Sequence, residues 1–240
     1  MMDFQNNLVR NVAKKKFDFA LVEKLYLLDV YIDGKRYYNV PNPDYVPEKN
    51  NILLYKSVTT IIDEKSDKSW YPEWVERVGQ EEADAVTNIS ARRGQSIHNM
   101  AEHYIRGEDY WKEQGTINVM DFNKLVPILN NHVDHIYGQE LPLYSHKLKT
   151  AGRTDLACWW DQYPAIVDFK TARRDKLEEQ IDAYMIQAAC YAKMFQERYA
   201  IHMDKIVILL LVDHEDEPRV FEDNVYPHWN DKVKEYFIGE

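Results

Sequence analysis

The chain has 240 residues, enough to bury one full hydrophobic core and short for two ordinary domains. Hydrophobic residues make up 45% of it, which excludes an intrinsically disordered protein, because such chains lack the apolar surface that offsets chain entropy. Its net charge of -10 at pH 7 opposes general attraction to a polyanion, so any nucleic-acid binding must be local.

Two features bear on the cellular compartment. Cys158 and Cys190 are too few and too far apart for a disulfide framework, a zinc site or a four-thiolate iron–sulfur cluster. Residues 1–16 are polar and basic without an apolar segment of signal-peptide length, and no later apolar run approaches membrane-spanning length. We therefore expect a soluble protein of the cytoplasm without membrane contact or, if it is phage-encoded, a protein of the host cytoplasm.

Residues 1–56 predict a hairpin followed by a loop. Residues 25–40 alternate around Asp33-Gly34, a turn dipeptide that favours a two-residue hairpin. Residues 41–51 are rich in proline and asparagine, which is typical of a loop.

Residues 57–139 predict a helical region, with Ser57 or Thr59 as its first cap. Gly94 is expected to interrupt the helical pattern and Gly107 to end it. The apolar spacing favours helices over residues 74–91, 95–105 and 121–137.

Residues 140–240 change from helical to strand-like spacing, with a turn at residues 161–164. The predicted elements are strands at 141–145, 153–160 and 165–169, a helix at 177–199 and a buried strand at 205–212. This order predicts a single α/β domain over residues 1–240, with a central mixed sheet flanked by helices.

Asp168 and Lys170 form the most informative pair in the sequence. Strand alternation places both on one face, with the carbonyl of Phe169 between them. A hairpin around residues 161–164 could bring Asp155 beside Asp168. Magnesium prefers oxygen ligands, and a nearby lysine can stabilise charge that develops during phosphodiester hydrolysis. The pattern therefore predicts a metal cleft with a lysine alongside.

The Asp-x-Lys triplet alone is not specific, because Asp33-Gly34-Lys35 and Asp63-Glu64-Lys65 share it. The first of these lies on a turn, and the second has no preceding acidic strand with which to pair. On spacing alone, a solvent-facing ion pair explains Asp168 and Lys170 equally well.

A family resemblance favours the metal site. The motifs that carry it are Arg93-Gly94-Gln95-Ser96-Ile97-His98, Gly152-Arg153-Thr154-Asp155-Leu156, Val167-Asp168-Phe169-Lys170-Thr171 and Gln187-x-x-x-Tyr191. In this order they resemble the RecB-type branch of the PD-(D/E)xK nuclease superfamily, with a pattern similar to the mitochondrial genome maintenance exonuclease and stand-alone phage exonucleases. The resemblance implies a restriction-endonuclease-like core with a helical N-terminal elaboration.

The resemblance also implies roles for individual residues. His98, Asp155, Asp168 and the Phe169 carbonyl would bind Mg²⁺, for which Mn²⁺ would substitute, and Lys170 would position water or stabilise the transition state. Glu102, one turn after His98, would orient its other nitrogen. Further residues that would support the site or contact DNA are Gln187, Tyr191, Arg153, Glu140 and Thr171. The cysteines of the iron–sulfur members are missing, so the family pattern implies no cluster here.

The function implied is an exonuclease that acts on single-stranded DNA ends in replication, recombination or repair, with proteins of those processes as partners. Two alternatives stay open: a non-catalytic nucleic-acid-binding module and an RNA-directed nuclease. Trp70 and Trp74 could stack on bases, although aromatic residues more often fill cores. Basic patches that could contact phosphates, but are individually more typical of solvated surface, are Lys14-Lys15-Lys16, Arg92-Arg93, Lys147/Lys149/Arg153 and Arg173-Arg174.

Overall fold

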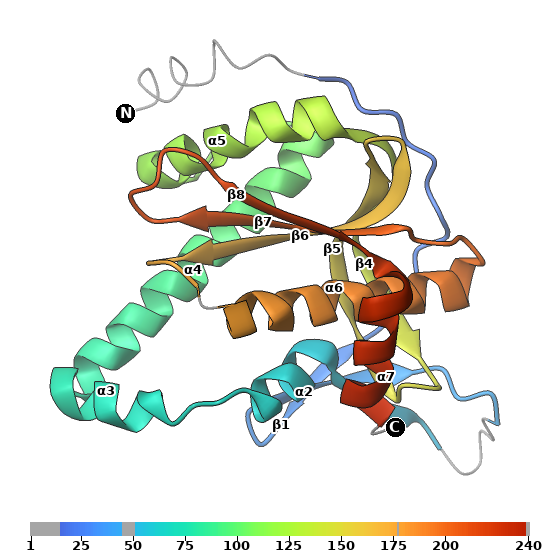
Figure 1. The fold of residues 1–240 in the computed structure, drawn as a ribbon, viewed down its shortest axis with the longest axis horizontal. Helices are drawn as coiled ribbons and strands as arrows, with labels where there is room; N and C mark the ends of the chain where they lie inside the picture. The colour runs from blue at the N-terminus through green and yellow to red at the C-terminus, as the bar shows by residue number, and fades with distance from the viewer. Residues whose placement is uncertain (1–14, 45–50, 177, 239–240) are drawn as a thin grey trace.

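A computed structural model describes residues 15–44, 51–176 and 178–238 of the chain (Figure 1). Its described strands form one sheet in the order β1-β2-β3-β5-β6-β7-β8, and β4 pairs with the other edge of β5 along its whole length. The β3–β5 and β6–β7 pairs are parallel, and the other pairs are antiparallel. Helices cover both faces, so the expected α/β class with a mixed sheet flanked by helices is confirmed.

The N-terminal hairpin forms as its turn residues predict. β1 (Asp29–Ile32) and β2 (Lys35–Val40) are joined by Asp33 and Gly34, whose φ angles are 51° and 74°. Positive φ at both turn residues matches the right-handed strand twist, which is why Asp-Gly is favoured there. β3 (Leu53–Ser57) then pairs with β2. Of the loop expected at 41–51, residues 45–50 lie outside the described residues.

The helical region begins where expected but is divided differently. Ser57 caps α2 (Val58–Lys65) by accepting a hydrogen bond from the Thr60 N–H at 3.0 Å. The next two helices, α3 (Trp70–Val78) and α4 (Gln80–Ile105), are separated at Gly79, whose φ is 86°.

The interruption predicted at Gly94 is wrong, because α4 runs through it. A glycine inside a helix costs only about 1 kcal/mol relative to alanine, and packing can offset that. At Gly94 the helix packs on β6, where a Cβ atom would lie 3.6 Å from Thr171 Oγ1. The end predicted at Gly107 is confirmed, since α4 stops at Ile105 and Gly107 adopts a φ of 77°.

The centre of the sheet consists of three consecutive strands after α5 (Thr116–His132): β4 (Val133–Ser145), β5 (Thr150–Trp160) and β6 (Tyr163–Ala172). The helix expected over residues 121–137 is present, but its predicted end is wrong, because the chain becomes a strand at Val133. The β4–β5 register shifts on both sides of Ile136, so the apolar residues there do not follow strand alternation and mimic helical spacing.

The helix and buried strand expected next are confirmed as α6 (Glu178–Tyr199) and β7 (Lys205–Val212), whose residues after Lys205 are all buried. Three elements that the sequence pattern did not predict complete the chain. They are the edge strand β8 (Arg219–Asn224), the short helical segment η2 (Val225–Trp229) and α7 (Asn230–Ile238).

Two hydrophobic cores lie on opposite faces of the sheet. One is rich in aromatic side chains and packs α4 and α5 on the sheet, with Tyr104, Tyr110 and Phe122 in mutual contact. The other packs α2, α6 and α7 on the opposite face. In the described part of the chain, no helix combines the length and apolarity that a membrane crossing requires.

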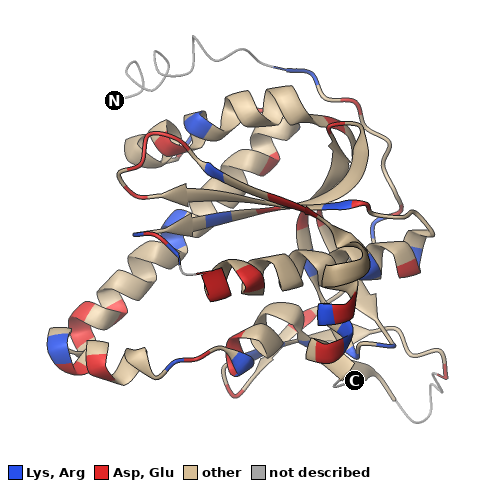
Figure 2. Cartoon of the chain, in the orientation of Figure 1, with Lys and Arg blue, Asp and Glu red and all other residues tan. Residues whose placement is uncertain are grey.

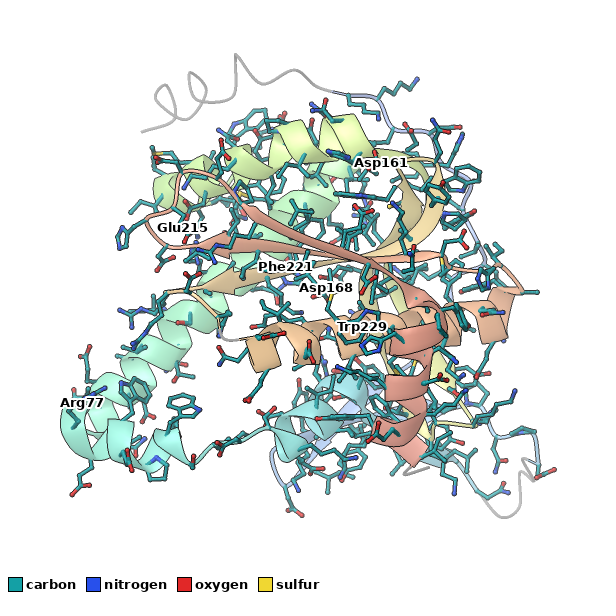
Figure 3. The ribbon with its side chains drawn as sticks, in the orientation of Figure 1. Arg77, Asp161, Asp168, Glu215, Phe221 and Trp229 are labelled. Carbon is teal, nitrogen blue, oxygen red and sulfur yellow. The ribbon has the colours of Figure 1, made fainter. Side chains whose placement is uncertain are left out.

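The arm, residues 70–93, stands away from both cores (Figure 1). It comprises α3, which has no buried residue, and the first half of α4, where Ala83 alone is buried before Ser96. Figure 3 shows Arg77 at its far end, whereas Asp168 lies near the middle of the molecule.

Candidate metal centre

The candidate site lies where the sheet opens between β5 and β6. One edge of β5 is paired with β4 from Thr150 to Trp160. On the other edge, β3 pairs with Thr150 and Ala151, and β6 pairs only from Leu156 onward. Residues 152–155 therefore have no strand partner on that edge, and this opening admits side chains from both layers.

Asp155 bridges the opening. Its Oδ2 accepts a hydrogen bond from the Phe169 N–H at 2.9 Å, in place of a backbone partner. In a β-strand the N–H and C=O of one residue point toward the same edge, so the Phe169 carbonyl is also directed toward the opening. This is the carbonyl that the sequence resemblance implies as a metal ligand.

Two further residues reach Asp155 from different elements. His98, on α4, places Nδ1 3.3 Å from Asp155 Oδ1. Glu140 lies across from Asp155 on β4, between the register pairs Gln139↔Leu156 and Leu141↔Thr154. One ligand atom from each of His98, Glu140 and Asp155 lies within 4.8 Å of the others, and all three residues are half-buried.

Glu140 adopts an unusual backbone conformation for a residue inside a strand, with a φ of 46°. A left-handed residue other than glycine, asparagine or aspartate costs on the order of 1 kcal/mol, and such strain is often found at functional sites. Sequence spacing placed Glu140 just before the first core strand, which is wrong: the strand begins at Val133. Because the left-handed kink interrupts alternation, sequence spacing did not reveal how close Glu140 comes to Asp155.

Asp168 and Lys170 form the second part of the site. Asp168 is 1% exposed; its Oδ1 accepts a hydrogen bond from Gln187 Nε2 at 3.0 Å, and its Oδ2 pairs with the Lys170 ammonium. The ammonium also lies 5.3 Å from the centre of the Tyr184 ring. The shared face of Asp168 and Lys170 is thus confirmed, and burial contradicts the alternative of a solvent-facing ion pair.

The pairing of His98 with Asp155 shifts the pKa of both groups. Burial alone would lower the pKa of His98, but the charge of Asp155 and the hydrogen bond to it outweigh burial and raise this pKa to about 9. Burial likewise acts to raise the pKa of Asp155, and the same pairing with His98 holds it below its ordinary value. Without a metal ion, His98 is therefore an imidazolium at neutral pH.

The carboxylates of Glu140 and Asp168 are both shielded from solvent and lie near the Asp155 charge. Burial and, secondarily, the Asp155 charge raise the pKa of Glu140 to about 7. Burial raises the pKa of Asp168 to about 6 despite the attraction of Lys170. Burial acts to lower the pKa of Lys170, but the Asp168 and Asp155 charges raise it above its ordinary value, so Lys170 stays an ammonium at neutral pH.

The structure separates the other predicted residues by role. Tyr191 is 1% exposed and braces the sheet: a Cβ atom on Gly152 would lie 2.7 Å from its Cε1. Gln187 is buried against Asp168. Both α6 residues therefore support the site from the face of the sheet that α6 covers. Arg153 is exposed, and its Nη1 lies 3.9 Å from Glu140 Oε2.

The role expected for Glu102 is not what the structure shows. Its carboxylate pairs with Arg106, one turn further along α4. The partner that fixes the His98 ring is Asp155, on β5. A local ion pair on an exposed helix face competes effectively for a carboxylate at this spacing, which explains the difference.

The donor set suits a divalent cation. An imidazole and two carboxylates converge within 4.8 Å, and hard divalent ions are bound by carboxylate and carbonyl oxygens, with imidazole nitrogen as a common further ligand. The pKa of Glu140 is raised mainly by burial and further by the Asp155 charge, a repulsion that a cation would relieve. Asp168, which the resemblance placed among the ligands, lies beside this group with its oxygens engaged by Gln187 and Lys170.

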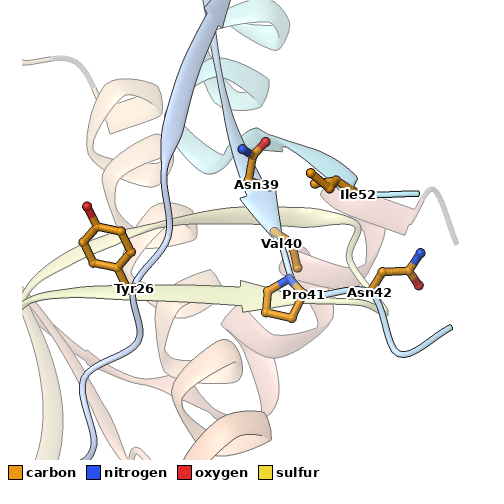
Figure 4. A pocket seen from close by; sticks show the side chains of 6 residues that line it. All are labelled: Tyr26, Asn39, Val40, Pro41, Asn42 and Ile52. Atoms are coloured by element: carbon orange, nitrogen blue, oxygen red, sulfur yellow. The ribbon is translucent and has the colours of Figure 1, made fainter. Parts of the chain in front are cut away.

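A separate hollow lies at the end of β2 (Figure 4). None of its lining residues belongs to the site described above. They are Tyr26, Asn39, Val40, Pro41, Asn42 and Ile52.

Comparison with known proteins adds little. No protein-family model matches the chain, and no curated protein matches it. One solved structure, described as the crystal structure of SSO0001, is 14% identical over 63% of this chain and 72% of that chain, with a TM-score of 0.31. A similarity at this level supports no conclusion about this chain.

Proposed function

We propose that the chain is a divalent-metal-dependent nuclease that hydrolyses phosphodiester bonds in DNA, acting as an exonuclease on single-stranded ends. The observation that carries the proposal is the convergence of His98, Glu140 and Asp155 directly beside the buried Asp168–Lys170 pair. The order of the sequence motifs, which resembles the PD-(D/E)xK nucleases, supports the same conclusion. Work on cellular or viral DNA in the cytoplasm, alongside replication or recombination proteins, is part of this proposal.

His98, Glu140 and Asp155, with the Phe169 carbonyl, would hold the cation, which supplies a Lewis acid for the phosphoryl oxygens and lowers the pKa of the attacking water. Lys170 supplies a fixed positive charge. Its raised pKa keeps it protonated at neutral pH, so it stabilises developing negative charge and does not act as a base.

Asp168 and Gln187 position that lysine. Gln187 holds one Asp168 oxygen at 3.0 Å, and the other oxygen pairs with Lys170. The Tyr184 ring lies 5.3 Å from the same ammonium and restricts where it can swing. Three side chains from α6 and β6 therefore fix one charge beside the metal ligands.

The test is a cleavage assay on single-stranded DNA, double-stranded DNA and single-stranded RNA, each labelled at the 5′ or the 3′ end, with Mg²⁺, Mn²⁺ or EDTA. We expect wild type to shorten single-stranded DNA with either metal and to be inactive in EDTA. Asp155→Asn and Lys170→Ala should lose at least about 100-fold in rate. Matched controls are Asp161→Asn and Lys147→Ala, which change exposed turn residues.

Three outcomes would overturn the proposal. Wild type that cleaves nothing, but binds DNA, indicates a binding module. Cleavage of RNA in preference to DNA indicates an RNA-directed enzyme. Full activity of both site variants shows that the chemistry lies elsewhere.

A further inference from the structure

Helix α4 packs across the C-terminal end of β6, next to the metal centre. Three arginines flank this crossing. The crossing point is the contact between Gly94 and Thr171. Arg92 precedes Gly94 on α4, and Arg173 and Arg174 follow the end of β6; all three are exposed. Figure 2 shows basic residues of α4 and of the β6 end on the same side of the molecule.

These three residues, the outer arginines, are not neutralised. Across the ranges 15–44, 51–176 and 178–238, the structure shows no ion pair from Arg92, Arg173 or Arg174 to an acid. The chain has 40 acidic residues against 30 basic ones, so three unpaired cations around one crossing are unexpected on its surface.

The neighbouring basic residues behave differently. Arg93 pairs with Asp121 at 3.1 Å and Asp213 at 2.8 Å, which ties α4 to α5 and to the end of β7. Arg219 pairs with Asp175 and with Glu215. The nearby acids Asp175 and Asp213 are thus occupied by structural arginines.

The outer arginines lie within reach of a chain that occupies the metal centre. Arg92 precedes His98 by less than two helical turns, or about 9 Å along the helix. Arg173 follows Lys170 by roughly 10 Å along the strand direction. An oligonucleotide with one phosphate at the metal ligands would reach both sides of the crossing within its next few nucleotides.

We propose that the outer arginines anchor the phosphate backbone of single-stranded DNA whose terminal phosphodiester lies at the metal centre. This inference rests on the proposed function. A single strand fits better than a duplex because the centre is recessed, with the Asp155 side chain 12% exposed, and a flexible strand can bend into it. Guanidinium groups bind phosphate oxygens by paired hydrogen bonds, which the free forks of these arginines offer.

The test measures the salt dependence of binding to a fluorescent single-stranded oligonucleotide by anisotropy, in EDTA so that nothing is cleaved. Each phosphate contact to a single strand contributes about 0.7 to the slope of log K against log salt. The triple variant Arg92→Gln/Arg173→Gln/Arg174→Gln should reduce the magnitude of this slope by about 2 and weaken binding at low salt by at least about tenfold.

The control is Lys147→Gln/Lys149→Gln, which removes positive charge from the exposed turn between β4 and β5. It should change neither the slope nor the affinity appreciably. The inference is overturned if both variants weaken binding equally, because only net charge would then matter, or if the triple variant binds like wild type. Tighter anchoring of a duplex than of a single strand by the arginines would also overturn it.

Cleavage measured in parallel tests the nuclease activity and the arginine anchor separately. Cleavage by wild type with an unchanged slope in the triple variant would refute the anchor and leave the nuclease in place. Arginine-dependent binding by a wild type that never cleaves would refute the nuclease and retain the anchor. Circular dichroism and thermal unfolding of each variant establish that the fold is intact.

Discussion

Asp155 Oδ2 accepts a hydrogen bond from the Phe169 N–H at 2.9 Å, while Asp155 Oδ1 lies 3.3 Å from the His98 ring. One carboxylate thereby closes the open stretch of the sheet and faces the other candidate metal ligands, His98 and Glu140, at the same time. The two functions can be separated experimentally, because an amide oxygen can still accept the Phe169 hydrogen bond but carries no charge.

Asp155→Asn should lower the pKa of His98 from about 9 to below its ordinary value of 6.5. Burial, which lowers this pKa, would remain, whereas the charge that raises it would be lost. NMR titration of the His98 ring measures the shift, and Asp161→Asn provides a control at an exposed aspartate. An unchanged His98 pKa would show that the two side chains are not paired in solution.

Binding of Mn²⁺ at pH 7.5 should release protons, because a metal ligand must be a neutral imidazole and His98 is protonated there. Affinity should rise with pH up to about 9 as the competing proton is lost. Calorimetry in buffers of different ionisation enthalpy counts the protons. Removal of the Mn²⁺ with EDTA should restore the original pKa of His98. A heat of binding that is independent of the buffer would exclude His98 as a ligand.

Glu140→Gln should stabilise the metal-free protein in alkaline solution. The folded pKa of Glu140, about 7, lies above its ordinary 4.5, so its favourable contribution is complete below 4.5 and is lost as pH rises through 7. The variant should match wild type at pH 4 and exceed it by about 1–2 kcal/mol at pH 8.5, after discounting for partial exposure.

The measurement is chemical denaturation across this pH range in EDTA, repeated with Mn²⁺. The metal should stabilise wild type more than the variant, because the amide is a poorer ligand than the carboxylate. A constant difference between the two proteins at all pH values would mean that Glu140 does not titrate in this window.

Lys170→Met should destabilise the fold by about 3 kcal/mol, because the buried Asp168 carboxylate loses its counter-charge. The double variant Asp168→Asn/Lys170→Met should recover most of this loss, since both charges are removed together. Urea denaturation of the two single variants and the double variant completes the thermodynamic cycle. If the effects of the single changes simply add, the ion pair is not formed in the folded protein.

Two glycine-to-alanine changes should have opposite signs. At Gly94 the added Cβ would meet Thr171 Oγ1 at 3.6 Å, an ordinary contact, so Gly94→Ala should stabilise α4 by up to about 1 kcal/mol. At Gly152 the Cβ would lie 2.7 Å from Tyr191 Cε1, so Gly152→Ala should destabilise by about 1–3 kcal/mol. Thermal unfolding compares both, and destabilisation by Gly94→Ala would contradict a continuous α4.

The parts of the site that depend on local periodicity could be predicted from the sequence. Strand alternation is sufficient to place Asp168 and Lys170 on one face, and the turn after Trp160 brings Asp155 near them. The closeness of Glu140 to Asp155 could not be predicted in the same way. Its left-handed φ of 46° and the register shifts before it break the period on which such an inference depends.

Long-range contacts account for the remaining differences. The sequence predicts a helix break at Gly94 because helix propensity is a local property. The packing partner of Gly94, Thr171, is remote in the sequence. For the same reason, the sequence predicts Glu102 as the partner of His98. In the structure Asp155, on another element, is that partner, and Glu102 pairs with Arg106. The opening between β5 and β6 lies where β3 pairs with the same edge of β5, a contact between remote segments that no single segment encodes.

The uninterrupted course of α4 has a mechanical consequence. A helix of 26 residues is about 39 Å long and resists bending, so it acts as a lever whose outer end lies in the arm and whose inner end carries His98. Tilting the arm must shift the imidazole relative to Asp155. The arm and the candidate metal ligand His98 thus belong to one continuous rigid element.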